Sequence, residues 1–140
     1  MVHDENCIFC KIVKKEIPAP ILYEDDKTLA FLDIRPASPR GGHTLVLPKN
    51  HYVNILDIPE DELEAVIKTI KKMSVALMKL APGMNILQNN GKDAGQFIMH
   101  AHFHLVPRFD GDGVTIEKWA VRQYGEGEME QTLRKIKSLL

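Results

Sequence analysis

Three histidines occupy every second position of one short stretch, at His100, His102 and His104, with apolar residues between them. Successive side chains of a β-strand point to opposite faces, so this alternation predicts a strand with the three imidazoles on one face, about 6.5–7 Å apart. The other face is apolar and suits a hydrophobic core. Each imidazole carries polar nitrogens that need partners, so such a row is unusual as packing. It is typical of proton transfer, nucleophilic attack or metal ligation near neutral pH.

The size and charge of the chain set limits on its partners. Its 140 residues fit a single domain with one core. Eighteen basic and nineteen acidic residues nearly cancel, which argues against a nucleic-acid polymer as partner and leaves room for a small phosphate pocket. No apolar run is long enough to span a bilayer, and residues 1–6 lack the apolar core of a signal peptide. We therefore expect no membrane association and a cytoplasmic location.

Hydrophobic periodicity predicts the secondary structure. The clearest helix is expected over residues 59–80, where apolar side chains recur at helical spacing after a proline and three acidic residues. Short helices are expected over residues 7–15 and 130–140, and strands over residues 21–24, 28–33, 43–47, 84–87 and 98–108. The order predicts an α+β fold: a mostly antiparallel five-stranded sheet with one long helix and short terminal helices.

Cys7 and Cys10 are the only cysteines, and two residues separate them. This spacing does not suggest a stabilising structural disulfide. Half of a metal site and a redox pair both remain open. A redox motif of the thioredoxin type follows a strand, and residues 1–6 offer none, which weighs against the redox interpretation.

A polar loop that contains glycines, residues 89–96, directly precedes the histidine stretch. Its glycines allow close approach of the backbone, and its side-chain amides can donate hydrogen bonds to phosphate oxygens. This neighbourhood favours phosphoryl or nucleotidyl chemistry. The alternating histidines alone would also permit a purely metal-binding role.

Residues 100–106 match the histidine-triad motif, and the chain resembles the histidine-triad (HIT) superfamily well beyond these residues. Four more segments match in the expected order: residues 7–12 (CIFCKI), 30–34 (AFLDI), 42–49 (GHTLVLPK) and 89–96. The likeness covers residues 7–108 of a single domain of residues 1–140 and leaves residues 109–140 as a C-terminal segment. It is strongest to the Hint branch, particularly small prokaryotic members with an N-terminal Cys-x-x-Cys.

The resemblance implies an enzyme mechanism. His102 is expected to attack the α-phosphorus of a nucleoside phosphate derivative, and water then releases the nucleoside monophosphate from a nucleotidyl-histidine intermediate. His104 is expected to contact the phosphate, and His43 to support proton transfer. Nucleoside 5′-phosphoramidates, with an AMP-type purine nucleotide as ligand, are the implied substrate class. The chemistry is expected to need no cofactor, because the nucleophile and the donors are protein groups.

The resemblance also implies a binding site with sugar, base and phosphate regions. The residues expected there are Asp33 and Ile34 at the sugar, Phe9 and Phe31 at the base, and Asn89, Gly95 and Gln96 at the phosphate. For the two phenylalanines, a place in the core explains the sequence equally well. The chain departs from the family pattern at Phe97, where many Hint-branch members carry a serine that contacts the leaving group or phosphate. This departure puts leaving-group preference and turnover in doubt.

Relatives that carry the cysteines imply a structural zinc ion, with Cys7, Cys10, His51 and His100 as its four ligands. Relatives also form two-fold homodimers through the long helix and a sheet edge, and their C-terminal segments often help to form the partner's pocket. Two other functions stay open. One is a dinucleoside polyphosphate hydrolase of the Fhit type, and the other is a zinc-stabilised nucleotide- or partner-binding module with little turnover.

Overall fold

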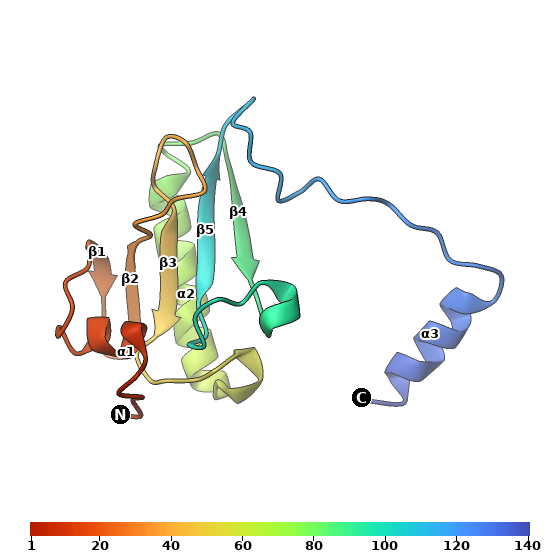
Figure 1. Cartoon of the computed structure of the whole chain (residues 1–140), viewed down its shortest axis with the longest axis horizontal. Helices are drawn as coiled ribbons and strands as arrows, with labels where there is room; N and C mark the ends of the chain where they lie inside the picture. Colours follow the sequence, from red (N-terminus) through yellow and green to blue (C-terminus); the bar gives the residue numbers. More distant parts are fainter.

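The computed structural model describes residues 1–140 and confirms the predicted α+β fold (Figure 1). All strand pairs are antiparallel, in the order β1-β2-β3-β5-β4. The strands are β1 (Ile21–Glu24), β2 (Thr28–Leu32), β3 (Thr44–Pro48), β4 (Gly83–Gln88) and β5 (Phe103–Arg108). The helices are α1 (Ile8–Val13), α2 (Glu60–Leu77) and α3 (Glu128–Lys137), with 3-10 turns η1 (Ile55–Asp57) and η2 (Lys92–Ala94).

Each face of the sheet is covered by a helix, because the central strands carry apolar residues at consecutive positions. In β3, Leu45 and Leu47 pack in one cluster with α1, whereas Val46 packs in a second cluster with Val66 and Ile70 of α2. Successive strand residues face opposite sides, so both clusters come from one short run. Burial on both faces explains why every residue of β3 is buried.

Helix α2 begins directly after Pro59, with three acidic residues in its first turn, where the helix dipole favours negative charge. It ends at Leu77, three residues before the predicted end. Leu80 is 74% exposed and therefore does not extend the buried stripe. The apolar stripe of α2 faces its own sheet through Val66, Ile70 and Leu77.

The histidine strand is shorter than predicted. Strand β5 begins at Phe103, so His100 and His102 lie in the segment before it and only His104 lies within it. The pairing with β3 extends only as far as Val46 opposite Phe103. Upstream of β5, the Ala101 N–H donates to the Tyr52 carbonyl, 2.7 Å away, which takes the backbone away from the ladder.

The C-terminal segment leaves the sheet after β5 and carries α3 away from the rest of the chain (Figure 1). No residue of α3 is buried, and its apolar residues Met129, Leu133 and Ile136 are more than half exposed. The start of the segment is held by Arg108, which donates to Asp112 at 2.8 Å, to Asn85 at 2.6 Å and to the Val114 carbonyl. None of the helices combines the length and the apolar character that a membrane crossing requires.

Candidate functional site

His102 and His104 lie on the α1 side of the sheet, with ring centroids 4.9 Å apart. The alternation along β5 places Phe103 and Leu105 in the cluster with α2, so His104 points to the opposite side. There both imidazoles border a pocket. The predicted separation of imidazole and apolar faces therefore holds for these two histidines.

The backbone determines which nitrogen of His102 carries the proton. Nδ1 of His102 lies 2.6 Å from the carbonyl oxygen of His100. A carbonyl can only accept, so Nδ1 donates and Nε2 of the neutral ring keeps its lone pair. The ring packs edge-on against Phe9 at 5.1 Å, and burial lowers the pKa of His102 below its ordinary value. His102 thus presents an uncharged nitrogen lone pair.

A second chain of hydrogen bonds determines the proton position in His104. The Ala37 N–H donates to Nδ1 of His43 at 2.9 Å, so the proton of neutral His43 resides on Nε2. Nε2 of His43 lies 2.9 Å from Nδ1 of His104 and donates to it. His104 therefore carries its own proton on Nε2. Burial lowers the pKa of His104 to about 4 and also lowers the pKa of His43, which keeps both rings neutral at pH 7.

Gly42 allows His43 to reach this position. Its φ of +83° is in the left-handed region that favours glycine, and an added Cβ would lie only 3.1 Å from Cγ of Pro107. The chain can therefore enter β3 close to β5 only with glycine here. A carboxylate oxygen of Asp33 also lies near the donating nitrogen of His43, 3.9 Å from Nε2.

The pocket has a volume of about 430 Å³ and is mostly apolar. Six of the residues predicted for catalysis or substrate binding line it: Phe9, Phe31, Asp33, Ile34, His102 and His104. Phe9 and Phe31 also pack edge-on against each other at 5.6 Å, so they serve the core and the pocket wall at once. An apolar cavity with a few polar groups is typical of small-molecule sites.

Three residues that were predicted to contact the phosphate do not line this pocket: Asn89, Gly95 and Gln96. Gln96 is buried, and its amide is already bonded within the chain. Its oxygen accepts from the Gly91 N–H of its own loop at 2.8 Å, and its nitrogen donates to the carbonyls of Val53 and Ile98. The Asn89 amide donates to the Gly95 carbonyl at 3.5 Å. Their contact with a phosphate stays a prediction.

The sequence interpretation missed some of the lining. Arg35 and Ile17 border the pocket, and neither was predicted to do so. Arg35 follows Asp33 by two residues and is the only lysine or arginine that lines it. Its position in the sequence beside a predicted ribose-binding residue was the available signal. Phe97 also borders the pocket and is 82% exposed.

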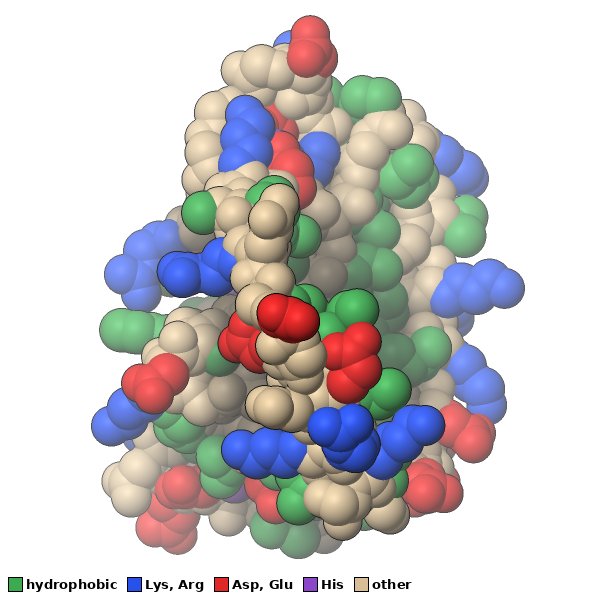
Figure 2. Space-filling model, turned by 90° about the vertical axis from the view of Figure 1, so that its right-hand side faces the viewer, with side chains coloured by type: hydrophobic (Ala, Val, Ile, Leu, Met, Phe, Trp, Pro, Cys, Tyr) green, Lys and Arg blue, Asp and Glu red, His purple; other side chains and the backbone are tan.

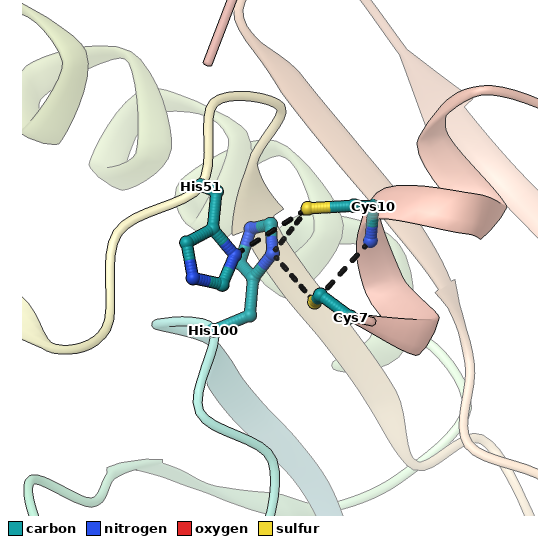
Figure 3. A group of neighbouring side chains, drawn as sticks. All are labelled: Cys7, Cys10, His51 and His100. Atoms are coloured by element: carbon teal, nitrogen blue, oxygen red, sulfur yellow. Dashed lines mark hydrogen bonds between the residues drawn. The ribbon is translucent and has the colours of Figure 1, made fainter. Parts of the chain in front are cut away.

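The four predicted metal ligands converge from separate parts of the chain (Figure 3). Nδ1 of His100 lies 3.4 Å from Sγ of Cys7 and 3.6 Å from Sγ of Cys10, and Nδ1 of His51 lies 3.4 Å from Sγ of Cys10. Tetrahedral zinc with Zn–S near 2.3 Å and Zn–N near 2.05 Å requires sulfur–nitrogen separations of about 3.6 Å. The donor set and its spacing therefore fit zinc.

The surroundings of the four groups support the same conclusion. Nε2 of His100 lies 2.9 Å from the Pro48 carbonyl oxygen, which fixes its proton there and leaves Nδ1 free as a ligand. Cys7 caps α1 and accepts from the Cys10 N–H, and Cys10 accepts from the Asp4 N–H. Burial raises the pKa of the Cys10 thiol to about 11, so a cation is needed to hold it as thiolate.

Comparisons with known proteins identify a matching family model and similar proteins. The HIT domain model matches residues 14–111. An uncharacterized HIT-like protein of Methanocaldococcus jannaschii is 47% identical over 132 residues, which span 94% of this chain and 98% of the relative. An adenosine 5′-monophosphoramidase of Saccharomyces cerevisiae is 43% identical over 120 residues, which span 86% of this chain and 73% of the relative.

Solved structures share the fold over nearly the whole length. The crystal structure of a HIT family member from Bacillus subtilis has a TM-score of 0.88 at 34% identity and covers 97% of this chain and 98% of its own. A zinc-bound histidine triad family protein from Mycobacterium smegmatis has a TM-score of 0.73 at 35% identity and covers 96% of this chain and 98% of its own.

Proposed function

Because the chain belongs to the HIT-domain family, we propose that it is a nucleotide hydrolase that cleaves nucleoside 5′-phosphoramidates and related derivatives of nucleoside monophosphates. One observation carries this proposal: the Nε2 lone pair of His102 and the Nε2–H of His104 border the same apolar pocket. A nucleophile and a donor are the two groups that displacement at phosphorus requires. The activity in the name of the yeast relative supports the substrate class.

In the first proposed step, Nε2 of His102 forms a bond to the α-phosphorus, and the bond between phosphorus and the leaving amine breaks. The amine departs with the electron pair of that bond and takes up a proton from solvent. Positive charge then develops on the ring of His102, whose Nδ1–H donates to the His100 carbonyl and so stabilises that charge. The Nε2–H of His104 donates to a phosphoryl oxygen, which gains negative charge in the transition state.

In the second step, water attacks the phosphorus of the nucleotidyl-histidine, and the bond to Nε2 of His102 breaks. The electron pair returns to the ring, water loses one proton to solvent, and the nucleoside monophosphate is released. Both steps use one lone pair on His102 and one donor on His104. The neutral tautomers that the backbone imposes are therefore the resting state of the proposed cycle.

The remaining pocket residues are proposed to bind the nucleoside. Phe9 and Phe31 provide the apolar wall for a base, and Ile34, which lines the pocket and is 83% exposed, is proposed to lie against the sugar. One carboxylate oxygen of Asp33 accepts from the Arg35 N–H at 2.9 Å, and the other is available to ribose hydroxyls.

Zinc is proposed to act structurally, held by Cys7, Cys10, His51 and His100. The four ligands join α1, the segment after β3 and the segment before β5. Phe9 lies between the two cysteines and contacts both His100 and His102. The bound ion would thus hold the pocket wall against the nucleophile.

We also propose that the chain forms a homodimer. Strand β4 is an open edge of the sheet and carries Ile86, which is 50% exposed. Helix α2 carries exposed Ile67, and exposed Met78 directly follows its last residue. Figure 2 looks onto the side from which the C-terminal segment projects and shows hydrophobic side chains gathered beside it. Open strand edges and apolar surface are typical of subunit interfaces.

Activity measurements test the proposed function. The wild type and His102→Gly are incubated with adenosine 5′-phosphoramidate and with diadenosine tetraphosphate, and AMP release is followed by chromatography. We expect faster release from the phosphoramidate and at least a 10³-fold loss in His102→Gly. His3→Ala, which changes a histidine outside the pocket, is the control. Faster cleavage of diadenosine tetraphosphate would favour the Fhit-type hydrolase, and AMP binding without turnover would favour the binding module.

A further inference from the structure

Arg35 is the one cationic side chain on the pocket lining. Of the seventeen lining residues, Arg35 is the only lysine or arginine and Asp33 is the only acid. The rest of the lining is mostly apolar. An anionic group in this pocket therefore finds a permanently charged cation only at Arg35.

The guanidinium of Arg35 is not used by the fold. It takes part in no hydrogen bond and no ion pair within the chain, although the Asp33 carboxylate is two residues away. Arg108 shows the contrast, since it bonds two acidic side chains, Asn85 and a carbonyl. A guanidinium offers five donors in a fork that matches phosphate and carboxylate geometry. At Arg35 all of these donors remain available to a ligand.

The two carboxylate oxygens of Asp33 face different neighbours. One carboxylate oxygen of Asp33 lies 3.9 Å from Nε2 of His43, and the other accepts the Arg35 N–H at 2.9 Å. Pro36 follows and restricts the backbone of Arg35 to extended conformations. The pocket lining therefore offers two donors to anionic groups, the Nε2–H of His104 and the guanidinium of Arg35.

We propose that Arg35 is a specificity-determining residue that binds a second anionic group of the nucleotide, in addition to the phosphoryl group at His102. The proposal rests on the proposed function for the position of that first group. The second group is a phosphate on the ribose 2′ or 3′ oxygen, or a further phosphate on the α-phosphate. Dinucleotide sites use these residue types as alternatives, with an acid for ribose hydroxyls or an arginine for a ribose 2′-phosphate.

Nucleotide binding tests this inference without turnover. Dissociation constants are measured by calorimetry for AMP, adenosine 2′,5′-bisphosphate, adenosine 3′,5′-bisphosphate and ADP. We expect at least one nucleotide with the second anion to bind the wild type about ten-fold to hundred-fold more tightly than AMP, the range for a hydrogen-bonded ion pair. A preference for a bisphosphate places the anion on the ribose, and a preference for ADP places it on the phosphate chain.

Three variants assign the effect to Arg35. Arg35→Gln should bind AMP as the wild type does and lose the preference, whereas Arg35→Lys should keep part of it. Arg40→Gln is the matched control, since Arg40 lies in the same loop but stacks on Phe109 at 4.4 Å and does not line the pocket. Equal binding of all four nucleotides, or an unchanged preference in Arg35→Gln, overturns this inference and leaves the proposed function standing. If no nucleotide binds, both are overturned.

Discussion

His43 donates its Nε2–H to Nδ1 of His104 across 2.9 Å, and this bond decides which nitrogen of His104 carries a proton. The decision originates in the backbone, because the Ala37 N–H occupies Nδ1 of His43. The Ala37 N–H thus determines, through His43, that Nε2 of His104 carries a proton. This donor lies on the same pocket lining as the lone pair of His102.

His43→Ala should lower kcat for adenosine 5′-phosphoramidate by about 10²-fold, since His104 is then free to place its proton on Nδ1 and lose the donor at Nε2. KM should change little, because His43 does not line the pocket. Glutamine can place an amide N–H near the position of Nε2, so His43→Gln should retain more activity than His43→Ala. Steady-state kinetics with the ring ¹⁵N shifts of His104 check both effects. Wild-type kcat in His43→Ala would show that His43 does not determine which nitrogen of His104 carries the proton.

Stability should fall between pH 6.5 and about pH 4 because of His104. Burial lowers its pKa in the folded chain to about 4, against about 6.5 in the unfolded chain. Above pH 6.5 both states are neutral at this ring. As the pH falls below 6.5, the unfolded chain takes up a proton that the folded chain does not, so the free energy of unfolding decreases until about pH 4.

Urea unfolding at a series of pH values measures this slope. His104→Gln cannot take up the proton, so its free energy of unfolding should vary less steeply over the same interval. The two proteins should differ little in slope above pH 6.5. A variant with the full wild-type slope would show that His104 is not the group responsible.

The purified protein should contain one zinc ion per chain, and Cys10→Ser should lose it. A ligand present at 100 times its dissociation constant stabilises the folded state by about 2.7 kcal/mol, so loss of zinc should lower Tm by about 5–10 °C. Elemental analysis and thermal unfolding with and without a chelator are the measurements. His3→Ala, which changes a histidine outside the ligand set, should keep its metal. A folded wild type without metal would refute the zinc proposal.

The two edges of the sheet allow a matched test of the dimer. Ile86→Arg places a charge on the open edge strand β4 and should convert the dimer to a monomer in light-scattering measurements. Leu22→Arg places the same charge on the opposite edge strand β1, at a residue of similar exposure, and should leave the dimer intact. A monomeric wild type would exclude this interface.

The sequence predicted the sheet well because its two faces follow from the alternation of side chains along each strand. Val46 and its neighbours in β3 alternate between two cores, and His104 alternates with Phe103 and Leu105 as expected. The same rule failed upstream, where the predicted strand was too long. There the Ala101 N–H bonds Tyr52, a long-range contact that no local pattern encodes.

The candidate site was likewise predictable from the sequence only in part. Residue types and the family resemblance predicted which histidines lie together, but the proton positions depend on the Ala37 amide and the His100 carbonyl. These are properties of loop geometry. Gln96 illustrates the reverse case, since its amide is used to hold its own loop. Arg35 was missed because a single charged residue in a loop carries no periodic signal.

The most direct test of the central claim is a search for the covalent intermediate on His102. The wild type is mixed with adenosine 5′-phosphoramidate, quenched in alkali during turnover, and analysed by intact and peptide mass spectrometry. The account predicts an adenylyl group on the peptide that contains His102 and none in His102→Gly, which should also fail to release AMP. AMP release by the wild type without any adduct at His102, or undiminished turnover by His102→Gly, would contradict it.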